Sequence, residues 1–474
     1  MGGWLSQGIA VSPRRWILLP IGFALKAREF HGNAMLAFEA AERGWGVIIG
    51  SKAIRYNAGL PRGMLIEKNI APGTGKKIAV SLTFGQRLSA CDEEGLVYNN
   101  AEEYGRRKIE KPTYDLLERF FCWGRHQASD LVNKLGCDGE KIVIAGNPRF
   151  DLHRPELRGV FAESVDQIKR EHGPFILINT KFSQYNGYYS PDAALTKMRV
   201  IGKINSAEQE KEARGQIAFH RTGFYKFMEL VEEVSRHFPE YTIIVRPHPS
   251  ERHDPWKAKA ATLPNVKVIC EGNVVEWILA SDACVHNNCT TGVESYLLGK
   301  PAISYRPVCH PEFDLYLPNA LSTEAFDLGT VMNLLCKTLR GEAIETTEEA
   351  ADRAAIAGQF IENVSGKRAC ERFLDALDTL ELPVEPLASS LGSIQHIGFT
   401  ARKKLRAIRR ALGRRTVGHT WAKESAARKS DHALKSDNIS EAELLEFLRA
   451  AQRVTGRFHD VQVVELQKEL LCIF

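Results

Sequence analysis

The chain has 474 residues, of which 44% are hydrophobic and 26% charged, and its formal net charge is +5. These values are ordinary for a soluble globular protein, and the length is enough for two domains with an appendage. No apolar run approaches the roughly 20 residues that span a bilayer, so we expect no transmembrane helix. Ten cysteines occur without a CxxC pair and no secretory signal is evident, which predicts reduced thiols in a cytoplasm.

The first elements form a strand–helix–strand unit. Residues 16–20 and 47–50 are apolar runs typical of buried strands, and residues 35–43 between them have helical spacing. Such a unit predicts a parallel sheet. Arg28 and Glu29 follow the first strand, at the edge where ligands bind in open α/β sheets, so both are candidate cleft residues. A solvated helix start is the alternative.

Three consecutive carboxylates, Asp92, Glu93 and Glu94, precede Gly95. Crowded like charges raise one another's pKa, which suits acid/base or nucleophilic chemistry. A solvated acidic turn is the alternative interpretation.

A further strand, near residues 141–145, leads into the loop Gly-Asn-Pro-Arg-Phe-Asp at 146–151. Asn147 and Arg149 are candidate ligand contacts. Alternatively, Arg149 and Asp151 fix the turn between two domains, and we favour this structural role. We place the end of the first domain at residue 152.

The second domain opens with an apolar strand at 175–178 that ends in Asn179, Thr180 and Lys181, three candidate cleft residues. Residues 183–215 have no clear apolar period. Long segments of this kind in compact domains are usually functional or mobile, so we expect an insertion bordering an acceptor.

The next strand, at 242–245, ends in Arg246-Pro-His248-Pro. Arg246 offers a planar fork of donors, and the two prolines restrict the backbone around His248. Both side chains are suited to a phosphate. A strand-end histidine without a ligand is the alternative.

A third strand, at 266–270, ends in Glu271. A carboxylate at this position can accept hydrogen bonds from both ribose hydroxyls, as the acidic residue of dinucleotide-binding folds does. The alternative is an acid placed near the start of the next helix, where the helix dipole favours it.

The loop after the strand at 283–286 supplies Asn287, Asn288, Thr290 and Thr291, followed by Glu294 in the first turns of a helix. Amide and hydroxyl donors at a helix start favour an anion. A simple helix cap is the alternative. Because the carboxyl ends of parallel strands meet at one edge of the sheet, we expect this loop beside the one that carries His248.

The chain reads as helical from residue 322 to 380, and we place the end of the second domain (153–381) there. Residues 394–474 are predicted to form a basic helical appendage. Within it, 401–435 contains twelve Lys and Arg residues against two acidic ones, and 400–415 is a basic amphipathic helix candidate. That composition suits an anionic membrane surface, with a plain solvated helix as the alternative. Residues 440–471 are predicted to form a small helical piece.

Four motifs, DEEG at 92–95, GNPRFD at 146–151, RPHP at 246–249 and NNCTTGVE at 287–294, together carry a family resemblance. The combination resembles bacterial surface-carbohydrate biosynthesis proteins, which look like GT-B glycosyltransferases using CMP-activated acidic sugars: Kdo transferases and, more distantly, sialyltransferases. The resemblance covers most of residues 16–380. It implies an α/β, GT-B-like fold of two Rossmann-like domains with a cleft between them.

The resemblance also implies roles for the candidate residues. One carboxylate of the acidic loop is catalytic, and we rank the three in their order along the chain. The loop with His248 and the hydroxyl pair Thr290 and Thr291 hold the CMP phosphate, and Glu271 binds ribose. Because His248 and Arg246 can neutralise a phosphate and no metal-ligating constellation is evident, we expect neither cofactor nor metal.

The predicted function is transfer of a 3-deoxy-ulosonic acid, Kdo by first choice, from its CMP-sugar to a glycan or lipid-linked glycan in surface polysaccharide biosynthesis. Attack by a carboxylate on the anomeric carbon retains configuration, as the resemblance implies, whereas activation of the acceptor hydroxyl inverts it; the sequence leaves both open.

We expect a cytoplasmic location at the inner face of the membrane, with contact through residues 400–435 and no nucleic-acid partner. The alternatives are a CDP-glycerol-type or UDP-sugar-dependent transferase on the same scaffold, and a non-catalytic assembly partner.

Overall fold

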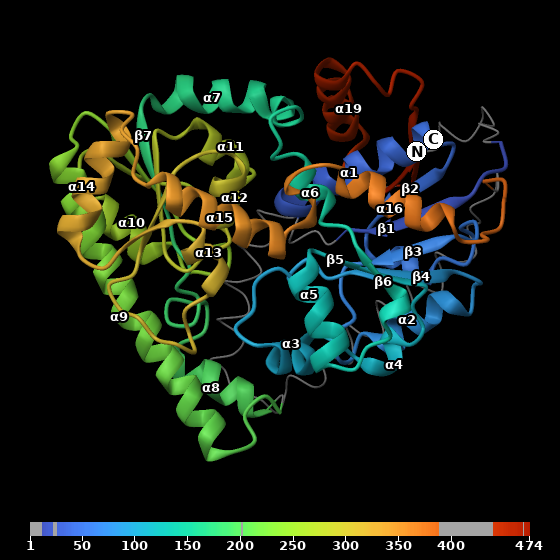
Figure 1. Ribbon diagram of the computed structural model, residues 1–474, viewed down its shortest axis with the longest axis horizontal. Coiled ribbons are helices and arrows are strands. Elements are labelled where there is room, and N and C mark those ends of the chain that lie inside the picture. Colours follow the sequence, from blue (N-terminus) through green and yellow to red (C-terminus); the bar gives the residue numbers. More distant parts are fainter. Residues whose placement is uncertain (1–11, 22–25, 201, 388–438, 468) are drawn as a thin grey trace. The chain divides into compact units, whose positions relative to one another are not determined.

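The computed structural model describes residues 12–21, 26–200, 202–387, 439–467 and 469–474. Its helices and strands group into two compact units, each built around its own sheet (Figure 1). The first unit comprises Met1–Leu96, Asn100–Leu152 and Gln359–Phe474, and the second comprises Val97–Asn99 and His153–Gly358.

The unit boundaries differ from the predicted domains at the C-terminal side. We expected the second domain to extend to residue 381 and residues 394–474 to form an appendage. The chain instead returns to the first unit at Gln359, and the described residues after 438 also belong there. The reason is that the last helices and strands pack on the first sheet. The basic segment 400–435 lies outside the described residues.

The first sheet has the strand order β13-β14-β2-β1-β3-β4-β5-β6. Its strands are β1 (Trp16–Pro20), β2 (Gly46–Gly50), β3 (Met64–Glu67), β4 (Arg87–Cys91), β5 (Arg119–Cys122), β6 (Ile142–Ile144), β13 (Val463–Gln467) and β14 (Leu470–Ile473). β1 to β6 are parallel to one another, and β1, β2 and β3 are wholly buried. Short apolar runs of this kind are expected where helices cover both faces of a parallel sheet.

The first unit has eight labelled α-helices among the described residues, and two of them, α16 and α19, contact α1 (Figure 1). The eight are α1 (Lys26–Glu42), α2 (Gly75–Leu82), α3 (Ala101–Lys108), α4 (Lys111–Tyr114), α5 (Arg125–Ser129), α6 (Pro148–Asp151), α16 (Ala369–Asp378) and α19 (Glu441–Thr455). The two C-terminal helices are therefore integral to the first unit.

The end of the chain is only partly helical. The predicted helix over 440–471 begins as expected at Ser440, which forms a capping box, but it stops at Gly456 in the left-handed region (φ 66°). The chain then forms the hairpin β13–β14, and β14 pairs antiparallel with β2. A strand replaces the predicted helix because the edge of β2 offers unpaired backbone groups that β14 satisfies.

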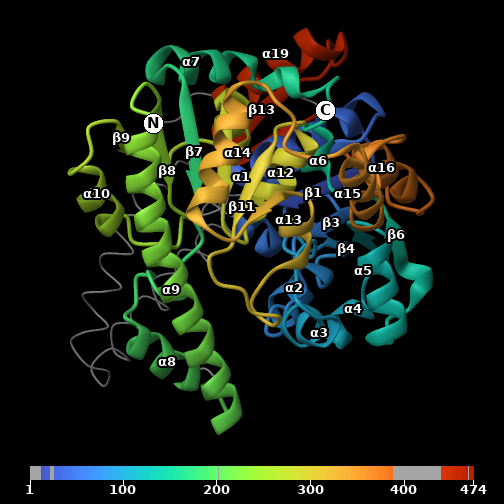
Figure 2. The ribbon, with the colours of Figure 1, turned by 60° about the vertical axis from the view of Figure 1, so that its left-hand side comes forward.

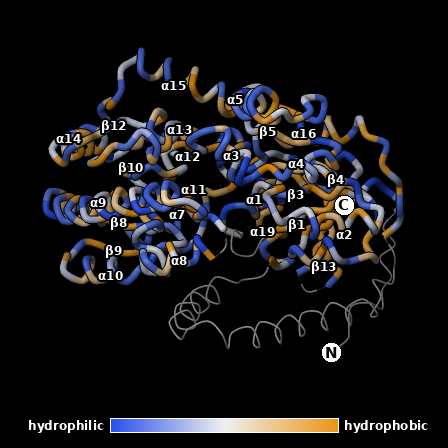
Figure 3. Tube along the Cα trace, turned by 90° about the horizontal axis from the view of Figure 1, so that it is seen from below, coloured by the Kyte–Doolittle hydropathy of each residue, from blue (hydrophilic) through white to orange (hydrophobic). Residues whose placement is uncertain are grey.

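The second sheet has the order β12-β11-β10-β7-β8-β9, and all its strands are parallel. They are β7 (Phe175–Asn179), β8 (Thr242–Arg246), β9 (Val266–Val268), β10 (Ala283–His286), β11 (Ala302–Tyr305) and β12 (Thr323–Ala325). Numbered within this unit the order is 6-5-4-1-2-3, which is the classical dinucleotide-binding order. In both units the strands are predominantly apolar (Figure 3).

The helices of the second unit are α7 (Ala162–His172), α8 (Pro191–Val200), α9 (Ala207–His237), α10 (Asp254–Ala260), α11 (Val274–Ala280), α12 (Thr291–Leu297), α13 (Tyr316–Ala320), α14 (Leu328–Leu339) and α15 (Thr347–Phe360). The segment 183–215, expected as an insertion, holds α8 and the start of the 31-residue α9. These two helices lie side by side in Figure 2 and are joined by the Arg199–Glu210 ion pair (2.6 Å).

The predicted class, α/β with two Rossmann-like domains, is confirmed by these two sheets. Within the described ranges, the structure contains no helix long and apolar enough to cross a membrane.

Candidate functional site

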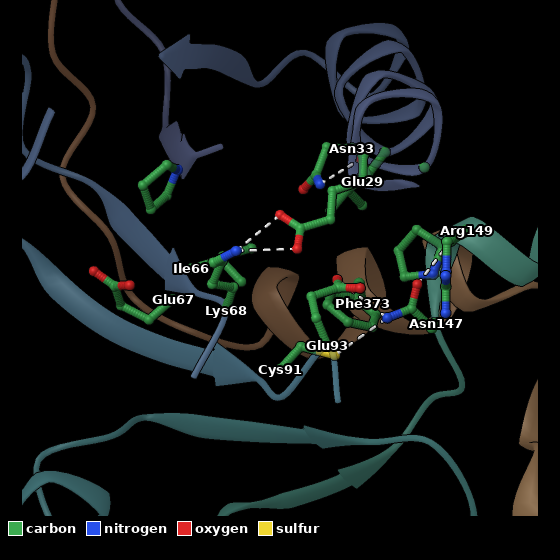
Figure 4. Close-up of a pocket in the computed structure, with 14 residues that line it drawn as sticks. Glu29, Asn33, Ile66, Glu67, Lys68, Cys91, Glu93, Asn147, Arg149 and Phe373 are labelled. Carbon is green, nitrogen blue, oxygen red and sulfur yellow. Dashed lines mark hydrogen bonds and ion pairs between the residues drawn. The ribbon is translucent and has the colours of Figure 1, made fainter. Parts of the chain in front are cut away.

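The first sheet reverses its direction of growth between β1 and β3, and ligands of doubly wound folds bind beyond the carboxyl ends of strands at such a switch point. A pocket lies there (Figure 4). Its lining comes from α1, from the ends of β1, β3 and β4, from α16 and from the start of α6: Pro20, Glu29, Gly32, Asn33, Leu36, Ile66, Glu67, Lys68, Cys91, Glu93, Asn147, Pro148, Arg149 and Phe373.

Close packing of α1 on α6 narrows one side of this pocket. A Cβ atom on Gly32 would lie 2.7 Å from the Arg149 Cα, so only glycine fits there. Asn147 caps α6, since its Oδ1 accepts a hydrogen bond from the Arg149 backbone N–H (2.9 Å). The cap turns the Asn147 amide nitrogen toward the acidic loop, where it donates to Glu93 Oε1 (3.2 Å).

Glu29 and Lys68 form an ion pair in the pocket. Glu29 is only 2% exposed, and its two carboxylate oxygens lie 3.0 and 3.2 Å from Lys68 Nζ. Arg28 Nη2 is 3.3 Å from Glu29 Oε1. The sequence predicts Arg28 and Glu29 as site residues but not Lys68. The apolar residues 64–66 of β3 (Met64–Glu67), which Lys68 follows, are the signal that could have located it.

Glu93 is the carboxylate of the acidic loop that lines the pocket. Its Oε2 has no hydrogen-bond partner among the described residues. Burial, and then the negative charge of Glu29, raise the pKa of Glu93, while Arg149 and Arg28 partly offset this effect. A carboxyl group with an open oxygen and a raised pKa holds a proton more readily than an exposed carboxyl group, which suits acid/base chemistry.

The other two acidic residues do not line the pocket. β4 ends at Cys91, and the turn that follows brings only Glu93 of the three carboxylates to the pocket. Asp92 is buried, its carbonyl accepts from Trp123 Nε1 (2.7 Å), and burial raises its pKa. The Glu94 side chain is 54% exposed and pairs with Lys108. Although burial opposes it, the Lys108 contact leaves the pKa of Glu94 below its usual value.

The loop 146–151 divides into two roles. Asn147 and Arg149 line the pocket, whereas Asp151 is fully buried and accepts from Asn363 Nδ2 (2.7 Å) and from two backbone N–H groups at the start of α16 (2.8 and 2.9 Å). Burial raises the pKa of Asp151. Asp151 therefore fixes the returning C-terminal segment within the first unit.

In the second unit the switch point lies between β7 and β10, and predicted residues from both strand ends meet there. The Lys181 backbone N–H donates to Asn287 Oδ1 (2.8 Å), and Lys181 Nζ lies 3.5 Å from the Asn288 carbonyl. Asn179 Nδ2 contacts Cys284 Sγ (3.7 Å). We expected the Asn287 loop beside the loop that carries His248. Both loops follow strands of this sheet, but β7 lies between β8 and β10, so the Asn287 loop contacts the loop after β7, which carries Lys181.

Glu251 organises this rim and was not predicted as a site residue. It is 0% exposed, and its Oε1 accepts from Thr180 Oγ1 and the Phe182 backbone N–H (both 2.9 Å) and from the His248 backbone N–H (3.3 Å). Burial raises the pKa of Glu251. Nothing in the local sequence separates it from an exposed loop acid, because its partners lie up to 71 residues away.

The ring of His248 is oriented by its own loop. Its Nδ1 accepts a hydrogen bond from the Ser250 backbone N–H (3.2 Å) and lies 2.6 Å from Ser250 Oγ. A backbone N–H can only donate, so the neutral ring carries its proton on Nε2. His248 Nε2 is therefore a donor, as a phosphate ligand must be.

The guanidinium of Arg246 binds backbone carbonyl groups of a neighbouring loop and is not directed at a phosphate site. Its Nη1 donates to the Glu271 carbonyl (2.5 Å) and its Nη2 to the Gly272 carbonyl (2.7 Å), and the guanidinium lies 5.4 Å from the Trp277 ring centroid. Burial lowers the pKa of Arg246. The side chain of Glu271 itself is exposed.

The loop before α12 also forms hydrogen bonds to other parts of the second unit. Asn288 has a positive φ (47°); its Nδ2 donates to Asp314 Oδ1 (2.9 Å) and to the Phe313 carbonyl, and its Oδ1 accepts from the Leu315 backbone N–H (2.6 Å) and from Asn319. Thr291 and Glu294 are buried, and Thr290, at the helix cap, is half-buried without a side-chain capping bond.

Comparisons with known proteins assign no family to the chain. No family model matches, and no curated protein matches. Among solved structures, the UDP-GlcNAc 2-epimerase of Neisseria meningitidis bound to UDP-GlcNAc has a TM-score of 0.46 at 12% identity, covering 77% of this chain and 100% of that one. The wall teichoic acid polymerase TagF has a TM-score of 0.44 at 11% sequence identity, and the match covers 78% of this chain and 91% of TagF. The UDP-GlcNAc 2-epimerase of Methanocaldococcus jannaschii has a TM-score of 0.44 at 12% sequence identity, and the match covers 77% of this chain and 99% of the epimerase.

Proposed function

We propose that the protein is a glycosyltransferase of surface polysaccharide biosynthesis, with Glu93 as its catalytic carboxylate and a nucleotide-activated sugar as its donor. The observation that carries the proposal is the pocket at the first switch point, where Glu93 keeps one carboxylate oxygen without a partner among the described residues. The resemblance of the sequence motifs favours a CMP-linked Kdo-like donor and a glycan acceptor.

The proposed donor site is the switch point of the second sheet. A sheet of this order binds nucleotides at that point, and His248 supplies an oriented Nε2 donor for a phosphate oxygen. We expect no metal to be required, because hydrogen-bond donors aimed at the departing phosphate can stabilise the charge that develops on it. Among the described residues no group of three or more His, Cys, Asp and Glu side chains could hold a metal ion.

Two routes are available to Glu93. As a nucleophile it attacks the anomeric carbon and configuration is retained over two displacements, as the resemblance implies. As a base it removes the acceptor hydroxyl proton while that oxygen attacks, and configuration is inverted. The raised pKa of Glu93 favours the second route, because it makes this carboxylate a stronger base than an exposed one. The anomeric configuration of the product, read by NMR, decides between the routes.

The test of donor class is thermal unfolding with CMP, UDP, CDP, GDP and ADP, each with and without EDTA. A ligand at 100 times its Kd stabilises the folded state by about 2.7 kcal/mol. Stabilisation by CMP alone, unaffected by EDTA, supports the proposal and is followed by an assay of CMP release from CMP-Kdo. A response to UDP or CDP, or one that needs metal, points to a UDP-sugar or CDP-glycerol transferase. No response to any nucleotide favours a non-catalytic assembly partner.

We also propose that the basic segment 400–435 brings the enzyme to the inner face of an anionic membrane, near a lipid-linked acceptor. Each basic side chain near such a surface contributes about 1 kcal/mol. The full chain should sediment with phosphatidylserine-containing vesicles and not with neutral ones. Replacement of the basic residues of 402–410 by glutamine should abolish this binding; equal binding by that variant would contradict the proposal.

A further inference from the structure

The pocket of the first unit contains a second carboxylate, Glu29, which differs from Glu93 in its partners. Lys68 Nζ contacts both Glu29 oxygens (3.0 and 3.2 Å) and Arg28 contacts one (3.3 Å). Glu93 forms no ion pair within 4.0 Å in the described part of the chain, and its Oε1 accepts a hydrogen bond from the neutral amide of Asn147 (3.2 Å). Two carboxylates therefore share one pocket, one held by cations and one open.

Lys68 connects the two carboxylates. Its ammonium group holds Glu29, and its backbone carbonyl accepts a hydrogen bond from the Glu93 backbone N–H (3.2 Å). Figure 4 shows the carboxylates of Glu29 and Glu93 turned toward the same space, with the Lys68 ammonium beside Glu29. Lys68 is itself only slightly exposed (12%), so the pair is shielded from solvent screening.

The remaining charged groups that act on Glu93 come from two helices. Arg28 lies on α1 and Arg149 on α6, and both favour the ionised form of Glu93. Glu29 opposes them, and burial opposes them further; together these two effects raise the pKa of Glu93. On β4 the Cys91 thiol is buried with a raised pKa, so it carries no competing charge near neutral pH.

We propose that the Glu29–Lys68 ion pair is a positioning element that sets the proton affinity of Glu93. Lys68 holds the Glu29 carboxylate in place, and the fixed negative charge keeps a proton on Glu93 at a higher pH than burial alone would. The functional consequence rests on the proposed catalytic role of Glu93, whereas the electrostatic coupling does not.

A neighbouring ion pair supplies a matched control. Glu67, the last residue of β3, is buried, lines the same pocket and is held by Arg55 through two hydrogen bonds. Figure 4 shows its carboxylate turned away from those of Glu29 and Glu93. Loss of this pair disturbs the same strand end without removing the charge that faces Glu93.

The test is an NMR pH titration of the full chain labelled with ¹³C at the glutamate carboxyl carbons, in which Glu93→Gln identifies the Glu93 resonance. Glu29→Gln removes a negative charge, so the Glu93 midpoint should fall by about one pH unit. Lys68→Gln removes a positive charge, so the midpoint should rise. Lys68→Arg and Glu67→Gln should leave it within about 0.2 units of the unsubstituted protein.

The inference is overturned if the midpoint of Glu29→Gln stays within about 0.2 units of the unsubstituted value, or if Glu67→Gln moves it equally. If Glu29→Gln does not fold, the contrast between Lys68→Gln and Lys68→Arg decides. The titration needs no substrate. Full transferase activity in Glu93→Gln would therefore reject the catalytic proposal while leaving the measured coupling between Glu29 and Glu93 intact. An unmoved Glu93 midpoint in Glu29→Gln would reject the coupling while leaving the catalytic proposal intact.

Discussion

The two switch points have related topology but use their polar side chains differently. At the first, Glu93 keeps an oxygen without a partner among the described residues and faces a pocket. At the second, Arg246, Asn288 and Glu251 are occupied in holding neighbouring loops. Polar residues at strand ends therefore mark the edge where ligands bind, but their positions in the sequence do not separate ligand-binding groups from groups that hold the loops in place. Hydrogen-bond partners make that distinction.

The largest expected effect tests the open carboxylate. Glu93→Gln should lower kcat by about 10³-fold, because an amide can neither take a proton nor attack carbon under these conditions. The measurement is CMP release from CMP-Kdo, or from whichever donor the nucleotide comparison selects. Glu94→Gln, a change at the exposed neighbour, should stay within a few-fold of the unsubstituted rate. Equal losses in both variants would remove the distinction between these two carboxylates.

At the switch point of the second sheet, the corresponding prediction concerns the free energy of unfolding. Glu251→Ala should lower the free energy of unfolding by about 3 kcal/mol, because it leaves several buried donors without an acceptor. Urea unfolding followed by circular dichroism measures this, with the exposed Glu240→Ala as control, which should change stability by less than about 0.5 kcal/mol. An unchanged urea midpoint in Glu251→Ala would show that this switch point does not depend on the buried acid.

Asn288 allows backbone and side-chain contributions to be separated. Asn288→Ala loses the hydrogen bonds to the loop near Asp314 and places alanine at positive φ, so a loss of about 2 kcal/mol is expected. Asn288→Gly loses the same hydrogen bonds but relieves the backbone, and its loss should be smaller by roughly 1 kcal/mol. Equal losses on chemical denaturation would mean that the backbone conformation contributes nothing.

The smallest effect is a pH dependence at the end of β10. His286 is fully buried, its Nε2 lies 2.8 Å from Ser322 Oγ, and burial lowers its pKa to about 3. In the unfolded chain the His286 ring takes up a proton near pH 6.5, whereas in the folded chain it stays neutral down to about pH 3. The free energy of unfolding is therefore unaffected by His286 above pH 6.5 and decreases as the pH falls from 6.5 toward 3. At pH 5 the loss is about 2 kcal/mol. Urea unfolding of His286→Gln between pH 5 and 7.5 should show a correspondingly flatter dependence, and an identical slope would contradict the assignment.

Much of the strand and helix order, the parallel core of both sheets and the ends of β1, β2, β7, β8 and β10 follow from the sequence alone, whereas β3 and the antiparallel hairpin β13–β14 do not. The sequence also placed Asn147, Arg149, His248 and the loop at Asn287 correctly at strand ends, because apolar runs and their polar continuations are local features.

Which of these side chains keep an atom without a hydrogen-bond partner depends on contacts made in the folded chain. The turn after β4 brings Glu93, and neither Asp92 nor Glu94, to the pocket, and Lys68 and Glu251 take their roles from partners far away in the chain. The C-terminal hairpin likewise depends on the edge of β2, which lies more than 400 residues earlier. Contacts of this separation leave no periodic trace in the sequence, so burial and hydrogen-bond partners could only be read from the folded chain.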